Sequence, residues 1–174
     1  MSNQEPNVNR RNFIKTAGGV GAALSAASPL AARPSSKPAS GRVLGANDRI
    51  NVAIIGCGGR GTYVGREFAK AGSSTHNAQI VAVCDPYQKR VTLNKGMHKC
   101  DGTLDYREIL TRSDVDAVIV ATPDHWHAPI ALAAMDKGKD VYLEKPMCHT
   151  VDEVKALIDT VRETKRVVQV GSQT

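Results

Sequence analysis

The sequence predicts an α/β fold of the Rossmann type, in which helices cover both faces of a doubly wound parallel sheet. Two observations support this prediction. Short, β-branched runs that suit buried parallel strands alternate along the chain with segments of helical periodicity. Glycines follow the first of these runs with the spacing G-x-G-x-x-G. Ligands of such sheets bind beyond the carboxyl ends of the strands, and so we expect the functional residues there.

The first half of the folded region begins near Arg49 with a strand over residues 50–55. A helix follows the glycines, because apolar and small residues recur at helical spacing as far as Gly72, where a cap is expected. The next strand covers residues 79–85 and ends in an acid, and a weakly patterned helix covers residues 86–97.

The second half repeats this alternation and ends in a strongly signalled helix. Thr150 and Glu153 have the spacing of a capping box, and apolar residues then mark one helical face from Val151 to Val161. The other predicted elements are a short helix over 105–110, strands over 115–121, 140–143 and 167–170, and a helix over 128–137 that stops at Gly138.

Composition and charge exclude two classes of protein. The 174 residues contain no run of 18 apolar residues, which excludes a membrane-spanning helix and integral membrane association. The net charge of +6 suggests nucleic-acid binding at first. However, residues 1–41 hold five Lys and Arg residues against one acid, so that residues 42–174 carry a net charge of only +2. The folded part is nearly neutral, and we expect no nucleic-acid partner.

The basic amino-terminal segment has the features of a targeting signal. Arg10 and Arg11 are followed by Phe13, Ile14 and Lys15, and then by a weakly apolar, Ala- and Gly-rich stretch. This pattern resembles a twin-arginine export signal, which implies recognition by the twin-arginine machinery and a periplasmic or outer-face location. The alternative is a disordered basic arm. We therefore divide the chain into a signal (1–32), a linker (33–48) and a nucleotide-binding domain (49–174).

The glycine loop predicts a binding site for a dinucleotide. Gly56 permits a tight turn, Gly58 leaves room for a pyrophosphate, and Gly61 lets the helix pack on the strand. Asp85 ends the following strand, where an acid accepts hydrogen bonds from the ribose hydroxyls and favours NAD over NADP. The alternative is a glycine-rich structural turn. Three nearby cations leave NADP open: Arg60, Lys89 and Arg90.

Two further segments carry a family resemblance. Residues 121–127 read Ala-Thr-Pro-Asp-His-Trp-His, and residues 138–146 read Gly-Lys-Asp-Val-Tyr-Leu-Glu-Lys-Pro. From about residue 49 onward, the chain resembles the Gfo/Idh/MocA oxidoreductases. The resemblance implies a Rossmann domain followed by an α+β domain, and hydride transfer between NAD(P) and a sugar or polyol. The glycines and the strand-end acid match the family's phosphate loop and ribose-binding residue.

The resemblance also assigns roles to the later motifs. Thr122, Pro123 and His127 match the segment that lines the nicotinamide half of the cofactor site. Lys145 matches the catalytic lysine, whose charge polarises the reacting hydroxyl, and Glu144 either orients Lys145 or binds the cofactor. The alternative interpretation of Lys145 is a surface lysine, and that of Glu144 is a solvated strand-end acid.

The resemblance leads us to expect that the family's second domain is missing, since the sequence ends at Thr174, where that domain should begin. We therefore expect a truncated product, a fragment or half of a split protein, in which cofactor binding is retained. Two other functions stay open: an NAD-dependent glycosidase or epimerase, and a non-catalytic dinucleotide-binding module. Substrate and oligomeric state are left undetermined.

Histidines and cysteines do not predict a metal site or a disulfide framework. His125 and His127 lie two residues apart, a spacing that does not share a helix face, and no cysteine pair or acid cluster completes a metal site. None of the four cysteines forms C-x-x-C, and export of an already folded protein disfavours a disulfide framework: Cys57, Cys84, Cys100 and Cys148.

Overall fold

The computed structural model describes residues 49–172 of the chain. The signal and linker expected over 1–32 and 33–48 lie outside the described residues. Within 49–172, no helix is both long enough and apolar enough to cross a membrane.

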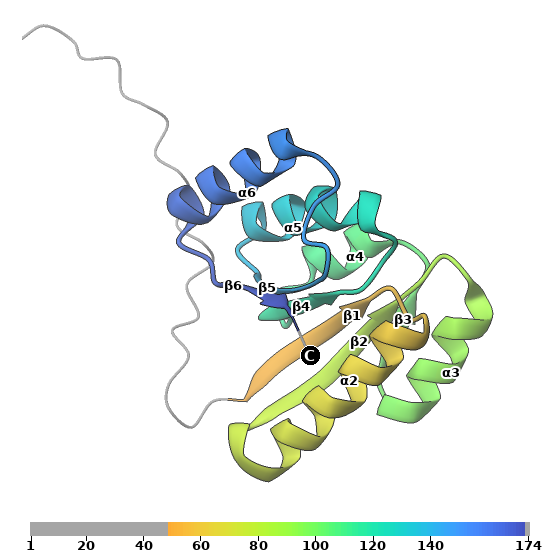
Figure 1. Ribbon diagram of the computed structural model, residues 1–174. Helices are drawn as coiled ribbons and strands as arrows, with labels where there is room; N and C mark the ends of the chain where they lie inside the picture. The colour runs from red at the N-terminus through yellow and green to blue at the C-terminus, as the bar shows by residue number, and fades with distance from the viewer. Residues whose placement is uncertain (1–48, 173–174) are drawn as a thin grey trace, which may run out of the picture. The chain divides into compact units, whose positions relative to one another are not determined.

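Six parallel strands form one sheet in the order β3-β2-β1-β4-β5-β6 (Figure 1). The order reverses between β1 and β4, which is the switch point of a doubly wound sheet. The strands are β1 (Ile50–Ile55), β2 (Ala78–Cys84), β3 (Asp101–Thr103), β4 (Ala117–Val120), β5 (Asp140–Glu144) and β6 (Val168–Gly171). The predicted fold class is confirmed.

Helices cover both faces of this sheet (Figure 1). α2 and α3 pack on one face, whereas α4, α5 and α6 pack on the other. The helices are α2 (Gly59–Ala71), α3 (Gln88–His98), α4 (Tyr106–Thr111), α5 (His127–Asp136) and α6 (Val151–Thr164). The capping box at the start of α6 is present as predicted, with the Thr150 hydroxyl accepting from the Glu153 amide.

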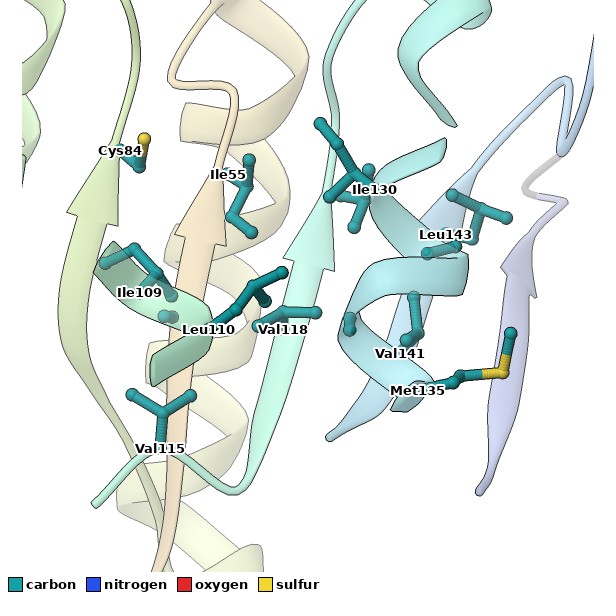
Figure 2. Close-up of a cluster of buried hydrophobic side chains, with 14 of the residues drawn as sticks. Ile55, Cys84, Ile109, Leu110, Val115, Val118, Ile130, Met135, Val141 and Leu143 are labelled. Carbon is teal, nitrogen blue, oxygen red and sulfur yellow. The ribbon is translucent and has the colours of Figure 1, made fainter. Parts of the chain in front are cut away.

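Strand residues alternate between two apolar layers, as the period of a β-strand requires. Ile55, Val118 and Leu143 face α4, α5 and α6 in the larger layer (Figure 2). Ile54 and Ile119 face α2 and α3 in the smaller one. The four central strands are buried on both faces, so their sequences read as nearly continuous apolar runs rather than as alternating ones.

Two local features differ from the sequence predictions. β3 was not predicted, because Asp101, Gly102 and Thr103 carry no apolar signal and become a strand only by pairing with β2. The helix α2 ends at Ala71 with Gly72 as its C-cap residue, as predicted, but Gly72 does not have the left-handed conformation of a typical glycine cap. Gly72 keeps a helical conformation and a π-helical turn (Gly72–His76) follows, ending at the left-handed Asn77. A Cβ on Gly72 would overlap the Ala78 carbonyl, which explains the glycine by packing rather than by capping.

Candidate functional site

The glycine loop between β1 and α2 lies at the carboxyl edge of the sheet. Gly56 has φ +93°, a conformation that favours glycine, and a Cβ there would lie 2.6 Å from the carbonyl atoms of Ala121. A Cβ on Gly61 would overlap the carbonyl oxygen of Gly56. The protein's own backbone therefore requires glycine at both positions.

Gly58 differs from the other two glycines of the motif. Its φ is −67°, which any residue adopts, and a Cβ there would meet only the Arg90 guanidinium at 4.0 Å. Neither conformation nor internal packing requires glycine at this position. Gly58 is the N-cap residue of α2, and the side chain of an N-cap residue generally lies beside the first amides of the helix.

The amino end of α2 is open. The helix begins at Gly59 with no side-chain cap, and its first turn contains no acidic residue. The first amides of a helix lack carbonyl partners one turn earlier, and the helix dipole places partial positive charge there. This end of α2 therefore suits an anion such as a pyrophosphate.

Asp85 follows β2 and reaches the glycine loop. Its side chain is 3% exposed; one oxygen accepts from the Cys57 amide and the other from the Tyr87 amide, both at 2.9 Å. Arg90 lies 3.6 Å from the same carboxylate. Arg90 approaches the oxygen that accepts from Cys57, whereas the oxygen that accepts from Tyr87 keeps a second acceptor site, which a ribose hydroxyl needs. Asp85 thus holds the loop in place and remains chemically suited to the role predicted for it.

Asn94, which the sequence analysis did not identify, supports the glycine loop through its side-chain amide. It is fully buried in α3, and its amide donates to the Arg90 carbonyl at 3.0 Å and to the Cys57 carbonyl at 3.5 Å. Asn94 lies three residues after Val91, a spacing that places both on one face of a helix. This spacing could have indicated that Asn94 is buried, but the apolar pattern of the helix was too weak to identify its buried face.

The two cysteines beside the loop are unreactive in this environment. Burial, followed by the negative charge of Asp85, raises the pKa of Cys57 to about 12. Burial and the neighbouring Cys57 raise the pKa of Cys84 to about 12. Both thiols are therefore protonated at neutral pH, and they pack as small apolar side chains.

The turns after β4 and β5 meet through His127. This residue is 2% exposed, with Nε2 lying 2.8 Å from the Thr122 carbonyl oxygen and Nδ1 lying 2.6 Å from the Pro146 carbonyl oxygen. Both ring nitrogens of His127 thus contact backbone carbonyls of the protein. Its expected place beside the nicotinamide half stays a prediction. Pro123 begins the next short turn, and its carbonyl accepts from the Trp126 amide.

Glu144 and Arg60 form an ion pair across the same edge. Arg60 Nε lies 2.9 Å from a Glu144 carboxylate oxygen, and the Glu144 side chain is 3% exposed. Lys145, the next residue, is exposed, and its side chain has no partner within residues 49–172. Glu144 is therefore a buried, paired acid and not the solvated strand-end acid of the alternative interpretation.

The strand order separates the predicted residues into two groups. Asp85 follows β2 and Glu144 follows β5, with β1 and β4 between these strands, so the two lie roughly 14 Å apart. Arg60 points to the Glu144 group. Of the three cations that left NADP open, Arg90 is the one that forms an ion pair with Asp85.

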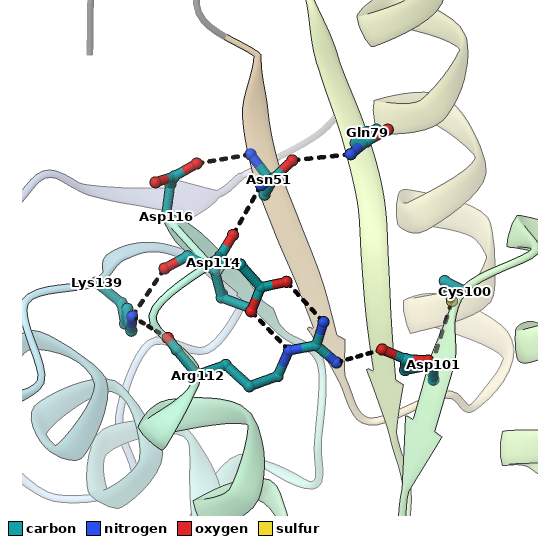
Figure 3. Close-up of polar contacts among 9 residues, drawn as sticks. Asn51, Gln79, Cys100, Asp101, Arg112, Asp114, Asp116 and Lys139 are labelled. Atoms are coloured by element: carbon teal, nitrogen blue, oxygen red, sulfur yellow. Dashed lines mark hydrogen bonds and ion pairs between the residues drawn. The ribbon is translucent and has the colours of Figure 1, made fainter. Parts of the chain in front are cut away.

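Within residues 49–172, no group of three or more His, Cys, Asp or Glu residues could hold a metal ion. A cavity of about 640 Å³ lies at the opposite, amino-terminal edge of the sheet and includes Arg112 and Asp114 in its lining. Arg112 already pairs there with Asp101 and Asp114 at 2.8 and 2.7 Å, so it offers no free charge to a ligand (Figure 3). The candidate site is therefore at the carboxyl edge.

Comparison with known families identifies the family of this domain. Residues 50–172 match the model of the Gfo/Idh/MocA oxidoreductase family with an NAD-binding Rossmann fold. The chain belongs to this family. Residues 7–27 match the signal sequence of the twin-arginine translocation pathway, as predicted from Arg10 and Arg11.

Two curated relatives resemble this chain along most of its length. A glycosyl hydrolase family 109 protein of Shewanella baltica is 35% identical over 92% of the chain. An alpha-N-acetylgalactosaminidase of Shewanella oneidensis is 34% identical over the same share. In both cases the chain spans 38% of the relative's length.

Solved structures show the same domain. A putative myo-inositol dehydrogenase from Sinorhizobium meliloti is 29% identical, with a TM-score of 0.62 over 70% of this chain and 36% of that one. An NAD-binding protein from Listeria innocua is 26% identical, with a TM-score of 0.64 over 71% of this chain and 35% of that one. NAD is thus the cofactor that family and fold support, and NADP stays open.

Proposed function

We propose that the protein is an NAD(P)-dependent oxidoreductase that exchanges hydride with a sugar or polyol, and that the described domain supplies its cofactor site. The observation that carries this proposal is Gly58. Its missing side chain serves no need of the protein itself, and yet it keeps clear the space before an open helix end.

Different residues at the carboxyl edge of the sheet would bind different parts of the cofactor. The amides at the start of α2 would bind the pyrophosphate, and Asp85 would bind the ribose of the adenosine half. When NAD is bound, its nicotinamide ring supplies the hydride acceptor. The turns after β4 and β5, which carry Thr122 and Lys145, would face that half.

Lys145 is the candidate catalytic residue. Its ammonium group is exposed and unpaired within residues 49–172, at the end of a strand whose last residue is anchored by an ion pair. A positive charge beside the reacting hydroxyl favours loss of its proton and stabilises the developing alkoxide character.

Gly58→Ala tests the cofactor site, with Gly59→Ala as its matched control. A Cβ on Gly59 meets nothing within 4 Å. We expect both variants to fold as the wild type does, because neither position is constrained by backbone or packing. In NADH titrations followed by fluorescence, Gly58→Ala should raise the Kd by at least about tenfold, or 1.4 kcal/mol, whereas Gly59→Ala should leave it nearly unchanged. Equal Kd values for Gly58→Ala and the wild type would contradict the proposal.

A second candidate function is an NAD-dependent glycosidase, in which oxidation of the sugar is transient. The names of the 34–35% identical relatives, glycosyl hydrolase family 109 protein and alpha-N-acetylgalactosaminidase, favour it. The two functions differ in their net products. The native protein, purified from its natural host, should accumulate NADH from polyols or free sugars if it is a dehydrogenase. A glycosidase should release the aglycone of a nitrophenyl N-acetylgalactosaminide without net NADH.

We also propose that the protein is exported to the periplasm or the outer face of the membrane through the twin-arginine pathway. The signal match over residues 7–27 supports this destination. Replacing Arg10 and Arg11 by lysine should leave a fused reporter in the cytoplasm. Export of the doubly substituted reporter by the same route would refute the assignment.

A further inference from the structure

His127 is placed where both of its ring nitrogens face hydrogen-bond acceptors. Nδ1 lies 2.6 Å from the Pro146 carbonyl oxygen, and Nε2 lies 2.8 Å from the Thr122 carbonyl oxygen. The residue is 2% exposed, so bulk water does not replace either contact.

The chemistry of imidazole then limits how many protons His127 carries. A carbonyl oxygen only accepts hydrogen bonds, and a ring nitrogen without a proton also only accepts. A neutral imidazole has one N–H, which would leave the lone pair of the other nitrogen against a carbonyl oxygen within 2.8 Å. That arrangement is repulsive and leaves a buried acceptor unsatisfied. Both contacts are satisfied only by the imidazolium form, which donates twice.

The surroundings both oppose and favour this charge. Burial disfavours a charge on His127, and so does the helix dipole, because His127 is the first residue of α5. Two short, charge-assisted hydrogen bonds act in the opposite direction. The other ionisable residues on the two segments that meet at His127 are Asp124, His125, Glu144, Lys145, Cys148 and His149, and Glu144 is already paired with Arg60.

We propose that His127 is an imidazolium that ties the turn after β4 to the turn after β5 and thereby positions Lys145. The two residues that flank Lys145 are each anchored: Glu144 by the Arg60 ion pair and Pro146 by His127. The backbone of Lys145 is held on both sides, while its own side chain is exposed. The importance of this position for catalysis rests on the proposed function, but the protonation and the tie do not.

The first experiment measures the protons directly. In the full 174-residue chain with ¹⁵N-labelled histidine, at pH 7, one histidine should show two protonated ring nitrogens, each with a one-bond coupling to a proton. This signal should disappear in His127→Gln and persist in His76→Gln, His98→Gln, His125→Gln and His149→Gln. The variants at the other histidines assign the signal to His127 by elimination, even if His127→Gln does not fold. A His127 ring with one bare nitrogen would overturn the proposal.

The second experiment measures the positioning. ¹⁵N relaxation should give the Lys145 amide of the wild type an order parameter of about 0.85, typical of rigid backbone. In His127→Gln it should fall toward about 0.6, whereas in His125→Gln, an exposed neighbour, it should not change. An unchanged Lys145 amide in a folded His127→Gln variant would overturn the positioning role. If both experiments give the expected results but NADH does not bind, the proposed function fails and the tie stands.

Discussion

Two lysines flank β5, and their surroundings differ completely. Lys139 precedes the strand; its ammonium group is buried and donates to the carbonyls of Arg112 at 2.6 Å and Val115 at 2.8 Å (Figure 3). Burial lowers the pKa of Lys139. Lys145 follows the strand, is exposed, and has no side-chain partner within residues 49–172. At one end of β5 the lysine is buried and bonded to the backbone, and at the other end the lysine is exposed to solvent and can contact a ligand.

The two edges of the sheet differ in the same way. At the amino edge, side chains satisfy one another: Arg112 binds Asp114 with two nitrogens, and Asn51 links Gln79 to the Asp114 carbonyl. At the carboxyl edge, the start of α2 has no cap and the space in front of Gly58 is clear. Polar groups that bond one another stabilise a fold, whereas uncommitted ones at a loop edge are free to bind a ligand.

Substitution of Lys139 should have the largest effect on stability. Lys139→Met keeps the aliphatic stem but leaves two carbonyl oxygens without their donor, at a cost of about 4 kcal/mol in the free energy of unfolding. Lys137→Met, an exposed neighbour, is the control. Urea denaturation measures both variants, and a cost for Lys139→Met as small as that for Lys137→Met would show that water replaces the buried donor.

Lys145→Met should reverse this pattern. We expect unfolding within about 0.5 kcal/mol of the wild type, because the side chain is exposed and unpaired. In the native protein, kcat should fall on the order of 10²-fold, or about 2.7 kcal/mol, with little change in NADH affinity. Stopped-flow and steady-state kinetics measure this loss. A near-normal kcat would reduce Lys145 to a strand-end lysine.

Asp85→Ala should affect both fold and binding, because this acid anchors the glycine loop and, in the proposed function, binds the adenosine ribose. Loss of the acceptor for the Cys57 and Tyr87 amides should cost about 2 kcal/mol of stability. NADH affinity should also fall, and the preference for NADH over NADPH should narrow. Asp136→Ala, an exposed acid, is the control. Calorimetry with each nucleotide measures both effects, and an unchanged NADH affinity would limit Asp85 to supporting the loop.

Acid should weaken the amino edge by a smaller amount. Hydrogen bonds from Arg112 lower the pKa of Asp114 below its unfolded value. The unfolded chain therefore takes up this proton first as the pH falls, so the stabilisation is present above about pH 4 and is lost below it. Asp114→Asn should lose less stability between pH 5 and pH 3 than the wild type. Parallel losses in the two proteins would contradict this linkage.

Local sequence patterns predicted much of the fold. The glycine spacing after β1, the acid after β2 and the Thr150–Glu153 capping box are determined by neighbours within a few residues, so they could be identified without contacts. The buried strands could be found because their apolar runs are continuous. β3 could not, because its three residues have no such run and pair with β2 instead.

The sequence by itself determined the order of strands and helices apart from β3, the glycine loop, and the choice of Asp85 and Lys145 as candidates. Only the tertiary structure decided that Lys139 is buried, that Arg60 pairs with Glu144 and that His127 bonds two turns. Arg60 and Glu144 are far apart in the chain and meet only because α2 begins beside the end of β5. Spacing encodes local hydrogen bonds and periodicity, whereas the partner of a long side chain depends on which strands the sheet places next to one another.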